Sequence, residues 1–92
     1  MALSVAFTPK SMNTARYEEI IRQLEQAGQG APQGRLYHVC YGPSDELRVT
    51  DIWNSVEELQ QFGATLMPIA EKLGVDVGQP EITPVHNAIV GR

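Results

Sequence analysis

The sequence lacks most features that mark secreted, nucleic-acid-binding or membrane proteins. It has one cysteine in 92 residues, so no disulfide can close within the chain. Seven basic residues are scattered against eleven acidic ones, and the net charge of −4 argues against binding to nucleic acid. No stretch approaches the roughly 18 apolar residues of a membrane helix, and the first ten residues are too weakly apolar for a signal peptide. We therefore expect a cytoplasmic protein that binds neither nucleic acid nor membranes.

The length predicts a single domain over residues 1–92 with a thin core, because a chain this short buries a modest share of its surface. Apolar residues in 2–8 alternate as in a strand, and Pro9 ends the pattern. Apolar residues at helical spacing follow, from a cap among residues 11–14 to a stop near Ala27. The segments 35–41 and 47–53 are predicted to be strands of a hairpin, separated by the turn GPSDE.

A second helix is predicted to start at the capping box Ser55-x-x-Glu58 and to end at Gly74. Pro68 is expected to kink or break it, because proline removes one helical hydrogen bond. The segment 81–90 is predicted to be the last strand, with Pro84 placing it at an edge or a bulge. The order β-α-β-β-α-β predicts an α+β ferredoxin-like plait, in which a four-stranded antiparallel sheet carries two helices on one face.

The strands carry apolar residues on both of their faces, and two helices can cover only one face of the sheet. In 35–41, for example, Tyr37, Val39 and Tyr41 oppose Leu36, His38 and Cys40. A second sheet packed on the uncovered face would bury it, so we predict a two-fold homodimer. The competing interpretation is a monomer that exposes a Tyr/Val patch.

The element order, together with DIWNSVEELQQF, LMPIAEKLG and PVHNAIV, resembles the dimeric α/β-barrel superfamily. The resemblance is closest to small single-domain proteins grouped with the antibiotic-biosynthesis monooxygenases. It implies a ferredoxin-like plait that pairs as a dimeric α/β barrel. Members of that group oxidise aromatic polyketides or phenols without metal or flavin, while others degrade haem with an Asn, a Trp and a His. Trp53, His86 and Asn87 supply those residue types, but their positions in the strands do not match.

The pairing of the hairpin decides which side chains share a face. If Val49 lies opposite His38, one face holds Leu36, His38, Cys40, Leu47, Val49, Asp51 and Trp53. If Val49 lies opposite Val39, His38 moves to the other face. We favour the first register because it gathers the more apolar set under the helices. His38 and Asp51 would then meet diagonally or through water, as an acid/base pair.

The candidate catalytic residues are therefore His38, Asp51 and His86, and the candidate ligand-binding residues are Tyr17, Trp53, Phe62 and Asn87. Each has a structural alternative: core or interface hydrogen bonding for the histidines, helix capping for Asp51, and packing for the aromatic residues. Gly63 either allows close packing or leaves room for a ligand. Cys40 is expected to be buried and inert. No metal-ligand spacing is present, and no cofactor is expected.

Two classes of function fit these residues. The first is a pocket protein that acts as a cofactor-independent monooxygenase on an aromatic or phenolic substrate, with a histidine removing the phenolic proton. The second is a non-catalytic protein that binds a small apolar ligand or only itself. Haem binding or degradation is a weaker third hypothesis.

Overall fold

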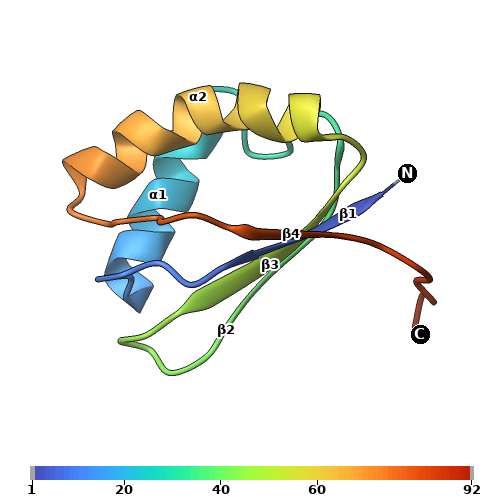
Figure 1. Ribbon diagram of the computed structural model, residues 1–92. Helices are drawn as coiled ribbons and strands as arrows, with labels where there is room; N and C mark the ends of the chain where they lie inside the picture. The colour runs from blue at the N-terminus through green and yellow to red at the C-terminus, as the bar shows by residue number, and fades with distance from the viewer. Residues whose placement is uncertain (1, 92) are drawn as a thin grey trace.

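The computed structural model describes residues 2–91, which form a four-stranded sheet with two helices. The elements are β1 (Leu3–Phe7), α1 (Thr14–Gln26), β2 (Arg35–Tyr41), β3 (Arg48–Trp53), α2 (Val56–Lys72) and β4 (Glu81–Pro84). The strand order is β2-β3-β1-β4, and every neighbouring pair is antiparallel. Both helices lie on one side of the sheet (Figure 1). The predicted α+β ferredoxin-like plait is confirmed.

The helix ends follow the expected local chemistry. The Asn13 side chain caps α1 by accepting a hydrogen bond from the Arg16 backbone N–H at 2.8 Å. Ser55 caps α2 as predicted: its hydroxyl accepts from the Glu58 backbone N–H at 3.2 Å and donates to Glu58 Oε1 at 2.9 Å. Gly74 follows the end of α2 with φ +75°, a conformation that favours glycine.

The end of the last strand was predicted wrongly, and so was one of the two alternatives for Pro68. This proline does not break α2, which runs through it as one helix. Its apolar face stays anchored on both sides of the proline, at Phe62 and Ile69, and this packing outweighs the lost hydrogen bond. The last strand ends at Pro84 and not at residue 90, because β4 finds partners on β1 only from Leu3 to Ala6. Residues 85–91 have no regular secondary structure and run past the sheet (Figure 1).

The hairpin pairs two residues away from the favoured register. His38 lies opposite Asp51, and Cys40 lies opposite Val49. A shift of two residues keeps the same faces, so the predicted grouping of His38 with Asp51 and Trp53 survives. Leu36 does not join that face, because the pairing shifts between Arg35 and Tyr37 and the Leu36 side chain is 61% exposed. Cys40 is only partly buried, in contrast to the prediction.

The core lies between the sheet and the helices. Val5 and Trp53 are fully buried at its centre, and segment 74–80 closes one end through a bridge between Lys10 and Asp76. The cluster of buried apolar side chains consists of Val5, Met12, Ile20, Leu24, Trp53, Phe62, Ile69, Ala70, Val75 and Val77. The sheet face away from the helices leaves Tyr37 and Tyr41 exposed. One face of the sheet therefore lines a core and the other is uncovered.

Candidate functional site

A row of four hydrogen-bonded side chains crosses the core face of the sheet and ends on α1. The Tyr17 hydroxyl lies 2.7 Å from His38 Nε2, and His38 Nδ1 lies 2.6 Å from Asp51 Oδ1. The Trp53 indole N–H donates to Asp51 Oδ2 over 3.1 Å. The relay of Tyr17, His38, Asp51 and Trp53 thus joins α1, β2 and β3.

The chemistry of each group sets the direction of the relay. A carboxylate has no hydrogen to donate, so His38 Nδ1 carries the hydrogen that Asp51 accepts. In the neutral imidazole, Nε2 is then an acceptor, and the Tyr17 hydroxyl donates to it. The two rings are almost parallel, with 3° between their planes. His38 therefore presents a basic nitrogen toward α1, with a tautomer held by Asp51.

The relay explains why a carboxylate stands two residues before the only tryptophan. Asp51 is 2% exposed, and Trp53 is fully buried. A buried carboxylate is costly unless hydrogen bonds replace its water. Both Asp51 oxygens have a donor, and within residues 2–91 every buried side-chain nitrogen or oxygen has a partner. Asp51 is therefore a satisfied core residue that orients His38, and it does not cap α2, which Ser55 does.

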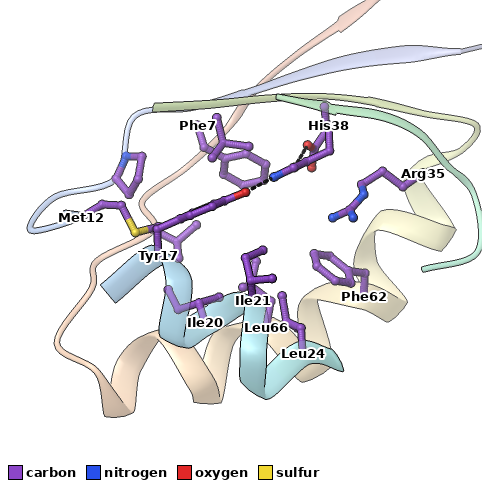
Figure 2. Close-up of a pocket in the computed structure, with 14 residues that line it drawn as sticks. Phe7, Met12, Tyr17, Ile20, Ile21, Leu24, Arg35, His38, Phe62 and Leu66 are labelled. Carbon is purple, nitrogen blue, oxygen red and sulfur yellow. Dashed lines mark hydrogen bonds and ion pairs between the residues drawn. The ribbon is translucent and has the colours of Figure 1, made fainter. Parts of the chain in front are cut away.

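A mostly apolar cavity of about 50 Å³ lies beside the relay, between the sheet and the helices. Its walls include Phe7, Met12, Ile20, Ile21, Leu24, Phe62 and Leu66, together with Tyr17, His38 and Arg35 (Figure 2). The predicted residues Tyr17, His38, Asp51 and Phe62 all line it. This volume is large enough for a few water molecules and is well below the roughly 300–1,000 Å³ of ligand pockets. Side chains must therefore move to admit an aromatic molecule.

A second hollow of about 220 Å³ adjoins the cavity. The two share the wall formed by Phe7, Phe62, Leu66 and Val77. Gly63 lines the second hollow, and a methyl group built at this position would meet nothing within 4 Å. Close packing at Gly63, one of the two alternatives, is therefore wrong, and the position faces open space.

Three predicted site residues lie outside the cavity walls. Trp53 packs behind Phe62, with ring centroids 5.4 Å apart, so it contacts the site through Asp51 and offers no ring face to a ligand. His86 and Asn87 are exposed and follow the end of β4, so they do not join the relay. The prediction that they lie on a strand was wrong, because the pairing of β4 with β1 ends at Pro84.

Arg35 lines the cavity and was missed from the sequence. Regular alternation places Arg35 and His38 on opposite faces, because they are three residues apart. The shift in pairing between Arg35 and Tyr37 is a β-bulge, and it returns Arg35 to the core face opposite Trp53. Nothing in the segment GRLYH signals a bulge, so only the pairing of the strands reveals this residue.

The Tyr17 phenol is expected to ionise above its ordinary pKa of 10.0. Burial raises the pKa of Tyr17, and the Asp51 carboxylate adds to the effect, because both disfavour the phenolate. A pKa that is higher in the folded than in the unfolded chain stabilises the fold below the unfolded pKa. That contribution is lost as the pH rises through the folded pKa of Tyr17.

An alkaline titration that follows phenolate absorbance, together with unfolding at each pH, tests this prediction. Tyr17→Phe should remove one phenolate step above pH 10 and flatten the alkaline loss of stability. Tyr37→Phe, on the uncovered face of the sheet, is the matched control. If the step missing from the Tyr17→Phe curve lies at or below pH 10, the expected rise in the pKa of Tyr17 is contradicted.

No protein-family model and no curated protein matches the sequence. Solved structures match over nearly the whole chain. A candidate antibiotic biosynthesis monooxygenase from Chloroflexus aurantiacus aligns with a TM-score of 0.64 and 15% identity, over 99% of this chain and 100% of that chain. SnoaB, a cofactor-independent oxygenase from Streptomyces nogalater, aligns with a TM-score of 0.60 and 15% identity, over 96% of this chain and 94% of that chain. The chain has the same fold as these proteins.

Rv0793 from Mycobacterium tuberculosis has this fold too, with a TM-score of 0.57 and 14% identity over 96% of this chain and 97% of that chain. The resemblance predicted from the sequence is thus confirmed at the level of the fold. Identities this low carry no substrate, because one fold serves many functions. Within residues 2–91, neither helix is long and apolar enough to cross a membrane.

Proposed function

We propose that this protein is a cofactor-independent monooxygenase that acts on an aromatic or phenolic substrate bound between the sheet and the helices. The observation that carries the proposal is the 2.7 Å contact between the Tyr17 hydroxyl and His38 Nε2. A phenol already sits on the basic nitrogen of His38, at the edge of an apolar cavity. A substrate phenol or enol in the place of the Tyr17 hydroxyl would meet the same acceptor.

His38 acts as the general base in this proposal, and Asp51 holds it in place. Nε2 takes the proton of the substrate hydroxyl, and the imidazolium is stabilised by the Asp51 carboxylate at Nδ1. The electron-rich substrate anion then reduces dioxygen and combines with it at carbon. Loss of water from the peroxide leaves a carbonyl, so a CH₂ group and O₂ become C=O and H₂O. One oxygen atom enters the product, and the substrate supplies all four electrons.

The apolar walls supply the other requirement of this chemistry. A dry site strengthens the interaction between the substrate anion and the charged His38. The cavity is too small for a ring system as it stands, so the Tyr17 ring has to leave His38 when substrate enters. The neighbouring hollow beyond Phe62 and Leu66 offers space for further rings.

Oxygen uptake with anthrone as the probe tests the proposal. Anthrone and O₂ become anthraquinone and water, so the CH₂ carbon loses two hydrogens and gains one oxygen atom. The wild-type protein should accelerate uptake, and ¹⁸O₂ should place one labelled atom in the product. His38→Gln should lower the rate to the background, while His86→Gln, an exposed position, should keep the wild-type rate. A His38→Gln protein with full activity would rule out this mechanism.

Binding without turnover is the second candidate function. It is favoured by the apolar lining and by the absence of a free nucleophile among the cavity residues. Retention of a small molecule in the purified protein, with no oxygen uptake on any phenol, would support it.

Haem binding finds less support, because both His38 nitrogens are already hydrogen-bonded and His86 is exposed. A Soret shift on haem titration would restore that hypothesis.

We also propose that the protein pairs through the uncovered face of its sheet. This face exposes Tyr37 and Tyr41 beside the partly buried Val39 and Ile52. An apolar sheet face of this kind is stable in water when a second copy covers it. Native mass spectrometry should record two chains for the wild type and one chain for Tyr37→Arg. A wild-type monomer would overturn the pairing and leave the site on α1 and β2 unaffected.

A further inference from the structure

We infer that Arg35 is an anion-binding subsite of the cavity, and that the ligand is a hydroxyaryl compound that also carries a carboxylate. The bulge in β2 is the first observation that supports this inference. It turns Arg35 onto the same face as His38, although regular alternation would send it to the uncovered face. Bulges are common beside active sites, where they redirect a side chain. Figure 2 shows Arg35 reaching toward the cavity from the side opposite Met12 and Tyr17.

The Arg35 guanidinium makes few contacts with the rest of the protein. One terminal nitrogen donates to the Gly30 carbonyl at 3.2 Å, and the group lies 5.6 Å from the centre of the Phe62 ring. Within residues 2–91, no carboxylate lies close enough to form an ion pair with it. A guanidinium has five N–H donors, so most of them remain available to a ligand.

Arg35 is the charged group of the cavity that has hydrogen-bond donors left for a ligand. The Asp51 carboxylate is the one acidic group in its walls, and both of its oxygens are already bonded to His38 and Trp53. The Arg35 charge also reaches the phenol position, since it lowers the pKa of Tyr17 against the larger effect of burial. A negative group in this apolar site is stabilised by Arg35 more strongly than in water.

These positions define the ligand class from its two ends. The hydroxyl group of the ligand faces His38, as the Tyr17 hydroxyl does. This part of the inference rests on the proposed function. The far end faces Arg35, whose planar guanidinium binds a carboxylate through two parallel hydrogen bonds. The apolar walls between them suit an aromatic ring.

Calorimetric titration with 4-hydroxybenzoate and 4-hydroxybenzamide tests the inference, because the two probes share a shape and differ in charge. The acid should bind the wild type at least about tenfold more tightly than the amide. Arg35→Gln should abolish this preference, and Arg35→Lys should retain part of it, since it keeps the charge without the planar fork. Arg22→Gln removes a charge on the exposed surface and should leave the preference unchanged.

The outcomes separate this inference from the proposed function. Equal binding of acid and amide to the wild type, or an unchanged preference in a folded Arg35→Gln protein, overturns the anion subsite and leaves the His38 mechanism standing. A preference that depends on Arg35 without any oxygen uptake supports the subsite and removes the monooxygenase. If neither probe binds, the subsite is wrong.

Discussion

Asp51→Asn should leave the protein folded and move the basic nitrogen of His38 from Nε2, which faces the cavity, to Nδ1. The asparagine oxygen can accept from the Trp53 indole N–H, as Asp51 Oδ2 does. Its NH₂ group then faces His38 Nδ1, which must become an acceptor, so the imidazole hydrogen moves to Nε2. The Tyr17 hydroxyl would accept from Nε2–H instead of donating to it. All three hydrogen bonds survive: the bond from Trp53 keeps its direction, and the two bonds of His38 reverse theirs.

The tautomer can be measured without a substrate. Nitrogen-15 spectra should place the His38 hydrogen on Nδ1 in the wild type and on Nε2 in Asp51→Asn. If the proposed function holds, oxygen uptake should fall by about 10²- to 10⁴-fold, the usual contribution of a general base. Asp45→Asn, in the exposed turn between β2 and β3, should change neither. A variant that keeps the hydrogen on Nδ1 and loses no activity would contradict the role of Asp51.

Trp53→Ala should have the largest effect on stability. Trp53 is fully buried, packs on Phe62 and donates to Asp51. Truncating a buried tryptophan costs about 3–5 kcal/mol of unfolding free energy, and domains are stable by only about 5–15 kcal/mol. Removing the indole also leaves Asp51 Oδ2 buried without a donor. The variant should therefore be at or near the threshold of unfolding.

Urea denaturation of a short series separates packing from hydrogen bonding. Trp53→Phe keeps an aromatic ring and loses the N–H donor, so it should lie between the wild type and Trp53→Ala. Leu36→Ala removes a large apolar side chain that is 61% exposed at the bulge, and it should change the unfolding free energy by less than about 0.5 kcal/mol. Equal losses in Leu36→Ala and Trp53→Ala would contradict the assignment of the core.

The repeat of apolar residues was enough to predict the fold. The helical spacing that runs through Ile20 and Leu24 and the capping box at Ser55 and Glu58 act within a few residues, so they can be read locally. The order of the elements then leaves few ways to form a two-layer domain. The end of the last strand at Pro84 was not predicted, because a strand ends where the neighbouring strand no longer offers hydrogen-bond partners.

Half of the relay was also predictable. Asp51 and Trp53 share a face because they are two residues apart, and a hairpin face that buries apolar residues brings His38 to their side. The favoured register had the correct face but placed His38 two residues away from Asp51. The period of two residues determines on which face of a strand each side chain lies. The register between two paired strands depends on the turn and on packing along the whole length of the pair.

By itself, the sequence determined the order and type of the elements, the face of each helix, and the grouping of His38, Asp51 and Trp53. Only the tertiary structure decided the direct pairing of His38 with Asp51, the hydrogen bond from Tyr17 on α1, and the turn of Arg35 into the cavity. The hydrogen bond joins residues 21 positions apart, and the turn of Arg35 depends on a bulge in the pairing of two strands. Local patterns carry no information on such contacts, because their geometry exists only once the sheet and helices have packed together.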